Sequence, residues 1–382
     1  MSELRVEWIR AVKEQSLETL KDVTHKDELK ALDRRGQNLL FYAIKSNALD
    51  VLYYLIHTAG LNVNQRNQYS ETPLHIAAHL GNQQALEILL THHADVRTIN
   101  DKCQSPLMLA AAKGAKDAVR TLIDHNARIQ GHDDLGQHVL FYALRGRKKS
   151  IFKALVLEGA YPHEVNIKRQ SLMHEVASLG DMRLFHLLRE YGVNAMMPDM
   201  YHQTPLHLAV IHQHTDMAMQ LCELGLSSYA QDRFNETPYR LAERYGNEEL
   251  LAYFERQKND PKSKEYKANY PLHEALLKGQ TDYVMAHIKT PAATRYDRHG
   301  ASLLFYALMQ ENQTVFEGVL QVHGIAKPLH QHLPYDVAEA VIMMRQDAFV
   351  ERLLAYDPLA FDQLNPKFLV CALNTTKTLL KR

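Results

Sequence analysis

The sequence predicts an all-α solenoid of about ten helix–turn–helix repeats with hairpin-like loops, capped at both ends. The first observation is a motif, residues 72–78 (Thr-Pro-Leu-His-Ile-Ala-Ala), which recurs closely at residues 204–209 and more loosely from Ser105, Leu172 and Pro271. The second is its period: the position of His75 recurs every 33 residues at Met108, Phe141, His174, His207, Arg240 and His273. A chain that repeats itself at such a step is interpreted as a repeat array before other folds are considered.

Each repeat is expected to contain two helices. Thr72 is suited to cap the first, and Pro73 lies in its first turn, where a missing N–H breaks no hydrogen bond. Gly81 permits the positive φ that ends this helix. A second helix is expected from Gln83 to Leu90, with leucines on one face. One such pair cannot bury its own apolar faces, so stability requires stacked neighbours.

Taken in order, residues 1–31 are expected to form the N-terminal capping helices, because apolar residues such as Trp8, Val12 and Leu20 alternate with charges. The repeat array is expected over residues 32–357, followed by a C-terminal capping helix at 358–382. Helix pairs are expected to begin near Asn38, Thr72, Ser105, His138, Ser171, Thr204, Thr237, Tyr270, Ser302 and, more weakly, Leu333.

A polar stretch at 257–268 interrupts the apolar pattern. Its composition is that of a domain linker, but the interval from Arg240 to His273 is still 33 residues. We therefore interpret it as a polar loop within one array, with a domain break as the alternative.

The motif resembles the ankyrin repeat family, and the resemblance covers nearly the whole chain. Three repeats depart from it, because bulkier sequences replace Thr-Pro-Leu-His at residues 39–43, 139–143 and 303–307 (Leu/Val-Leu-Phe-Tyr-Ala), which predicts altered packing. The family places a structural histidine, bonded to the neighbouring repeat, at the position of His75, His174, His207 and His273. The irregular repeats and short caps look similar to bacterial ankyrin proteins, some of which act as effectors in host cells.

The composition restricts the classes of function. The 382 residues include 44 basic and 44 acidic side chains, so no global field attracts the chain to nucleic acid or to an acidic membrane. Cys103, Cys222 and Cys371 are far apart, as in proteins of a reducing compartment. No stretch approaches 18 apolar residues and the start lacks a signal-peptide core. A cytoplasmic location is expected, with secretion into a host cell by a signal-peptide-independent route as a further option.

Sites for chemistry are sparse. The closest histidine pairs among 22 histidines are His92–His93, His212 with His214, and His330 with His332, and no HExxH motif occurs. The sequence lacks a G-x-S-x-G elbow, a phosphate-binding loop and a kinase signature. Cys103 stands at a turn-glycine position, where a small turn residue is favoured over a reactive thiol. We therefore predict no catalytic, cofactor or metal residues and no enzyme activity; the alternative is an enzyme, or a metal- or small-ligand-responsive protein, that uses the array as a frame.

The resemblance implies that partners bind the concave face, formed by hairpin tips and the outward side of the first helix. At those positions basic residues outnumber acidic ones: Arg34, Arg35, Lys45, Lys102, Lys113, Arg145, Lys168, Arg233, Arg244, Lys267, Lys278 and Arg298 against Glu71, Asp101, Asp134 and Glu236. The alternative is that acidic neighbours neutralise some of these cations. Gln203, in one of these hairpins, is expected to be exposed.

The later repeats add apolar residues at positions that should be solvated, and aromatic residues and methionine are enriched at binding sites. The alternative is that later hairpins bury each other's tips. The predicted protein-binding residues are Met200, Tyr201, Ile211, Arg233, Phe234, Arg244, Tyr245, Tyr266, Lys267, Leu277 and Lys278. We thus expect a monomeric scaffold or adaptor, free of cofactors, that binds a protein with acidic and apolar anchor residues. Neither nucleic acid nor membrane insertion is expected, and an effector role in a host cell is one setting for it.

Overall fold

The structure of the chain is a computed structural model that describes residues 4–23, 26–259, 271–277, 279–296, 302–309, 312–323, 349 and 352–353. These residues form helices, turns and loops without a strand; an isolated bridge joins His132 and His138. The predicted all-α repeat fold is therefore confirmed. The repeat expected near Leu333 and the capping helix expected at 358–382 lie outside the described residues.

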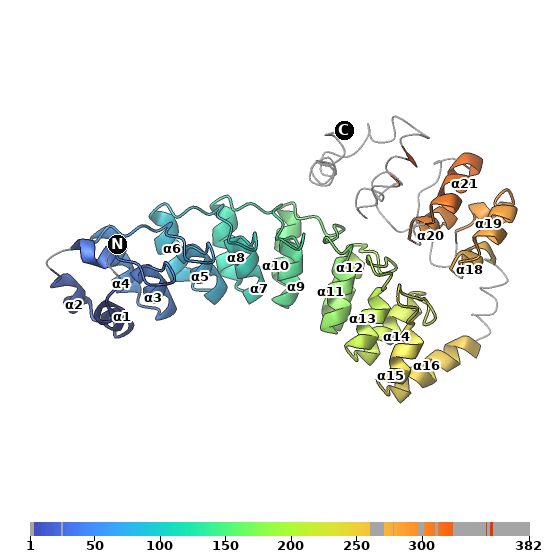
Figure 1. Cartoon of the computed structure of the whole chain (residues 1–382), viewed down its shortest axis with the longest axis horizontal. Helices are drawn as coiled ribbons and strands as arrows, with labels where there is room; N and C mark the ends of the chain where they lie inside the picture. Colours follow the sequence, from blue (N-terminus) through green and yellow to red (C-terminus); the bar gives the residue numbers. More distant parts are fainter. Residues whose placement is uncertain are drawn as a thin grey trace. The chain divides into compact units, whose positions relative to one another are not determined.

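The helices follow the predicted order (Figure 1). The N-terminal cap consists of α1 (Val6–Lys13) and α2 (Leu17–Lys21), followed by the 3₁₀ helix η1 (Lys26–Lys30). The first helices of the repeats are α3 (Leu39–Lys45), α5 (Pro73–Leu80), α7 (Pro106–Lys113), α9 (Val139–Arg145), α11 (Leu172–Leu179), α13 (Pro205–Ile211), α15 (Pro238–Arg244), α18 (Pro271–Leu277) and α20 (Leu303–Met309). Each begins one residue after the position that the sequence predicts.

The second helices are α4 (Leu49–His57), α6 (Gln83–Thr91), α8 (Lys116–Asp124), α10 (Lys149–Leu157), α12 (Met182–Glu190), α14 (Thr215–Glu223), α16 (Glu248–Asn259), α19 (Thr281–His287) and α21 (Gln313–His323), with a short 3₁₀ helix η2 (Pro291–Thr294) after α19. Because α16 continues to Asn259, residues 257–259 are helical and do not belong to the loop predicted at 257–268. The remainder of that loop lies outside the described residues.

The chain divides into two compact units, Met1–Tyr161 and Pro162–Arg382. In the first compact unit α5 packs against α7 and α7 against α9, while α6 packs against α8 (Figure 1). In the second, α11 packs against α13, α13 against α15, and α14 against α16. These repeats therefore form stacks of helix pairs, from α3 to α10 in the first unit and from α11 to α16 in the second.

The core follows the 33-residue period. One position of the first helix is filled by Leu74, Leu107, Leu140, Met173 and Leu206, each of which is completely buried. One position of the second helix is filled by Leu89, Leu122, Leu155, Leu188 and Leu221, which are equally buried. The periodic apolar positions that identify the repeat in the sequence are therefore the positions that pack between repeats.

In two of the altered repeats the tyrosine hydroxyl makes a hydrogen bond to the preceding hairpin. The Tyr42 hydroxyl donates to Asp33 Oδ2 at 2.7 Å, and the Tyr142 hydroxyl donates to Asp133 Oδ2 at 2.6 Å. Burial, together with the bond to Asp33, raises the pKa of Tyr42 to about 12. In these repeats the tyrosine ties the first helix to the hairpin that precedes it, a link that the Thr-Pro-Leu-His sequence does not make.

The turn of one altered repeat also requires a glycine for steric reasons. Gly146 follows α9 with φ −67°, which any residue can adopt, but an added Cβ would lie 2.2 Å from the Ala111 carbonyl oxygen of the preceding repeat. We therefore expect Gly146→Ala to destabilise the first compact unit by about 1–3 kcal/mol, measured by urea unfolding. Gly131→Ala is the matched control, since its new Cβ would meet only Met108 Cε at 3.8 Å. An unchanged midpoint for Gly146→Ala would contradict the packing of these turns.

Candidate protein-binding surface

The hairpins between repeats share one internal geometry. Each begins with an aspartate or asparagine whose side chain accepts from the backbone two and four residues later; Asp199 Oδ1 accepts from Tyr201 N at 2.8 Å and from Gln203 N at 3.0 Å. The fourth residue has a positive φ: Cys103, at 55°, takes this position, as do Ser70 and His202. Cys103 is thus a turn residue, which is the role that the sequence favours over that of a reactive thiol. The two residues between, such as Met200 and Tyr201, form the tip.

Successive tips are joined by backbone hydrogen bonds. In the second compact unit Met200 N donates to Lys168 O at 2.8 Å, and Arg233 N donates to Tyr201 O at 2.9 Å. The first compact unit repeats this pattern with Gln68 N to Arg35 O, Asp101 N to Tyr69 O and Asp134 N to Lys102 O. Each unit therefore presents its tips as a connected row rather than as independent loops.

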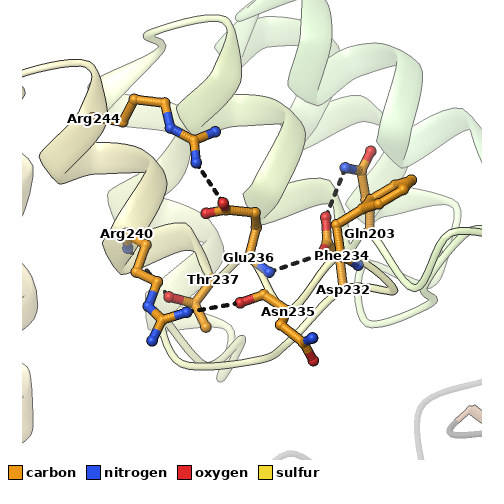
Figure 2. Close-up of polar contacts among 8 residues, drawn as sticks. All are labelled: Gln203, Asp232, Phe234, Asn235, Glu236, Thr237, Arg240 and Arg244. Carbon is orange, nitrogen blue, oxygen red and sulfur yellow. Dashed lines mark hydrogen bonds and ion pairs between the residues drawn. The ribbon is translucent and has the colours of Figure 1, made fainter.

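Side chains reinforce the row in the second compact unit. Gln170 Nε2 donates to Asp199 Oδ2 at 3.1 Å, and Gln203 Nε2 donates to Asp232 Oδ2 at 3.0 Å (Figure 2). Gln203 is half-buried by this contact, so the expectation that it is exposed is wrong. A side chain that bridges two hairpins holds both tips in place.

Two aromatic residues predicted to bind a partner lie next to each other on this row. The rings of Tyr201 and Phe234 are stacked with centroids 6.3 Å apart. Their exposed fractions are 36% and 67%. The alternative interpretation requires these tips to bury each other. Tyr201 and Phe234 instead stay exposed, and Met200 is half-buried.

Three further predicted residues, Ile211, Arg244 and Tyr245, lie at the ends of first helices. Ile211 ends α13 and is half-buried, while Tyr245 follows α15 and is 41% exposed. Arg244 forms an ion pair with Glu236 of the neighbouring hairpin (Figure 2). Leu277 ends α18, but its side chain, together with Tyr266, Lys267 and Lys278, lies outside what the structure describes.

The predicted excess of positive charge is smaller than the residue count implies. Besides Arg244, Lys45 donates to Gln37 Oε1 and lies over the Tyr42 ring. Arg145 donates to Gln137 Oε1 and lies over the Tyr142 ring. These three cations are held against their own repeats, which supports the alternative that some of the basic set is internally occupied. Arg233, at the tip beside Phe234, remains exposed.

One exposed apolar residue at the hairpins was missed by sequence reasoning. Ile99 is 46% exposed and directly precedes the hairpin asparagine Asn100, and its carbonyl accepts from Arg66 Nη1 at 3.2 Å. Its position precedes the tip, so the search of tip positions did not include it. In the first compact unit it adds to the exposed tips Tyr69 and Leu135.

Three histidines of the repeat motif, His75, His174 and His207, make the structural hydrogen bonds that the resemblance implies. The backbone N–H of Thr72 donates to His75 Nδ1 at 3.1 Å, so Nδ1 is an acceptor and the proton lies on Nε2. His75 Nε2 then donates to Gln104 O of the next hairpin at 3.1 Å. His174 makes the same bonds with Ser171 N and Gln203 O. Both ring nitrogens are occupied, which leaves neither for a metal.

The other histidine pairs offer little for a metal. His214 Nε2 donates to Ser178 O at 3.0 Å, while its ring lies against that of His212. The described residues contain no group of three or more histidine, cysteine, aspartate or glutamate side chains that could hold a metal ion. His330, His332 and Cys371 lie outside the described residues. Burial raises the pKa of the Cys222 thiol to about 12.

Comparison with known proteins identifies the repeat. The family described as ankyrin repeats (3 copies) matches residues 8–100, 93–169, 147–232 and 172–265, more than half of the chain. The chain belongs to the ankyrin-repeat family. Ankyrin repeats are typically binding modules without catalytic residues. None of the helices in the described part of this ankyrin array combines the length and apolar character that a membrane crossing needs.

Two further comparisons, one with a curated protein and one with a solved structure, show similarity over part of the chain. The chain is 32% identical over 103 residues to the potassium channel SKOR of Arabidopsis thaliana, a match that covers 24% of this chain and 12% of the channel. The crystal structure of the ankyrin repeat domain of Bcl-3, a unique member of the IkappaB protein family, superposes with a TM-score of 0.46. That match has 21% identity and covers 56% of this chain and 99% of the other.

Proposed function

We propose that this ankyrin array is a scaffold or adaptor that binds a partner protein through the hairpin tips and first-helix ends of its second compact unit. The observation that carries the proposal is the stacked pair Tyr201 and Phe234, which stays exposed on a row of tips joined by hydrogen bonds. Aromatic side chains on a rigid support lose little entropy on binding and are frequent hot spots. Tyr245, exposed at the end of α15, extends the same apolar set.

The charges beside this pair define the partner further. Arg233 and Lys168 are exposed at neighbouring tips. Arg244 forms an ion pair with Glu236. We infer that the partner presents an apolar anchor with acidic residues next to it. Charges at the rim of an interface act mainly on the association rate and its salt dependence. An effector role in a host cell is one setting for such a partner. Capture of the partner from host extracts rather than from bacterial extracts distinguishes this role from one inside a bacterium.

The decisive experiment is affinity capture with a double variant. Tyr201→Ala with Phe234→Ala is expected to abolish recovery of the partner, because each hot-spot aromatic contributes at least about 2 kcal/mol, or roughly 30-fold in affinity. The substitutions remove exposed side chains, so thermal unfolding should be unchanged. Captured proteins are compared with wild type by mass spectrometry.

The matched control is Tyr69→Ala with Leu135→Ala, which removes exposed tip residues of the first compact unit. This control should retain the partner. If the control loses the partner while Tyr201→Ala with Phe234→Ala keeps it, the binding surface lies on the first compact unit.

Arg233→Glu with Lys168→Glu should slow association most at low salt.

A further inference from the structure

A group of cations lies away from the hairpin tips, on the turns between the two helices of consecutive repeats. The turn from α7 to α8 carries Lys113 and Lys116; the turn from α9 to α10 carries Arg147, Lys148 and Lys149. We call these five residues the basic turn patch. All are exposed except Lys149, which is half-buried, and among the described residues none of the five forms an ion pair.

The two turns are in direct contact. A Cβ added at Gly114 would lie 2.9 Å from the Gly146 carbonyl oxygen and 3.2 Å from Lys148 Cγ. The backbone of one turn therefore lies directly against the backbone of the other. Next to the two turns, α7 packs along α9 (Figure 1). The cations are therefore held together by the fold rather than brought together by mobile loops.

This arrangement is electrostatically unfavourable in the free protein. Lys148 is the N-cap of α10 and Lys149 is its first residue, where the helix dipole disfavours positive charge. Residues 135–157 contain five basic and no acidic side chains in a chain of zero net charge, and Asp117 is the acidic residue next to Lys116. A cost with no compensating contact within the protein points to a role in binding anions.

The composition of the basic turn patch selects among anionic partners. Protein interfaces are depleted in lysine and need an apolar centre, but four of these five residues are lysines and the turns carry no large apolar side chain. Single-stranded nucleic acid needs aromatic stacking platforms, yet Phe141, Tyr142 and Phe152 are buried.

We propose that the basic turn patch adsorbs to the surface of an anionic phospholipid bilayer. Helix–helix turns of neighbouring repeats lie along one edge of an array, and an edge can meet a plane with all its cations at once. Juxtamembrane lysines and arginines gain attraction from anionic headgroups without inserting apolar residues. The basic turn patch belongs to the first compact unit, whereas the proposed protein-binding residues belong to the second.

Vesicle sedimentation of the full chain tests the proposal. Wild type should sediment with vesicles of equal parts phosphatidylserine and phosphatidylcholine, weaken as salt is raised, and stay in solution with phosphatidylcholine alone. The triple variant Arg147→Gln, Lys148→Gln and Lys149→Gln should lose about 100-fold in apparent affinity, because each cation near the surface contributes roughly fivefold. Lys113→Gln with Lys116→Gln on the adjacent turn should lose about tenfold or more by the same reasoning, and this variant decides the matter if the triple variant fails to fold.

The matched control removes three exposed cations of the N-terminal cap: Arg10→Gln, Lys13→Gln and Lys21→Gln. It has the same net charge as the triple variant and should bind as wild type does. Failure of wild type to sediment with the anionic vesicles, or equal binding by the triple variant and this control, overturns the proposal. So does a triple variant that keeps vesicle binding but loses binding to duplex DNA or polyglutamate, since a different polyanion is then the partner.

Discussion

Replacing Leu206 by alanine is expected to lower the free energy of unfolding by about 2–5 kcal/mol. Leu206 is completely buried in α13, which packs between α11 and α15. In a repeat array, stability is approximately a sum of repeat terms and neighbour interfaces. The cavity left by the leucine side chain therefore weakens the contact of one repeat with the repeats on both sides. Urea unfolding followed by circular dichroism measures the change.

The control for this prediction is the same substitution at an exposed leucine. Leu157 ends α10 with 85% of its surface exposed. Leu157→Ala removes the same atoms without opening a cavity, so its effect should stay within about 0.5 kcal/mol. Equal destabilisation by the two substitutions would show that burial in α13 is not what stabilises the second compact unit.

The positions of the helices could be predicted because their determinants are local. A serine, threonine or asparagine cap before an apolar run fixes the start of most first helices to within a residue, as at Ser105 and Ser171. The 33-residue period then identifies the core, since the same position is buried in successive repeats. The start of the predicted polar loop was placed too early, because the polar residues Gln257 to Asn259 continue a helix as readily as they form a loop.

The side-chain links between hairpins could not be predicted in the same way. Gln203 and Asp232 are 29 residues apart, and their contact exists only because adjacent tips are stacked. The pair Glu236 and Arg244 likewise depends on the hairpin folding back beside the end of α15. Of the basic turn patch the sequence search included Lys113 alone, because a search confined to concave positions does not include Arg147 or Lys148. The binding role of the tip residues remains a prediction until the capture experiment is done.

Acid is expected to destabilise the array through its buried motif histidines. Burial lowers the pKa of His75 and of His174 from the ordinary value of 6.5 to about 4, and it lowers that of His207 as well. Protonation of His75 or His174 at Nδ1 would also oppose the backbone N–H that donates to that atom. Since the unfolded chain takes up these protons first, the stabilisation is complete above pH 6.5 and is lost as pH falls toward 4. The loss amounts to roughly 3 kcal/mol for each of His75 and His174.

The variant His174→Gln separates this effect from the titration of carboxylates. Glutamine keeps an acceptor and a donor but does not titrate, so the variant should be less stable at neutral pH and lose less stability between pH 6.5 and 4 than wild type. Urea unfolding across that range measures both slopes. His79→Gln, at an exposed position near the end of α5, is the control and should keep the wild-type slope. A His174→Gln slope equal to that of wild type would mean that His174 is protonated in the folded array, and the buried tautomer described above would then be wrong.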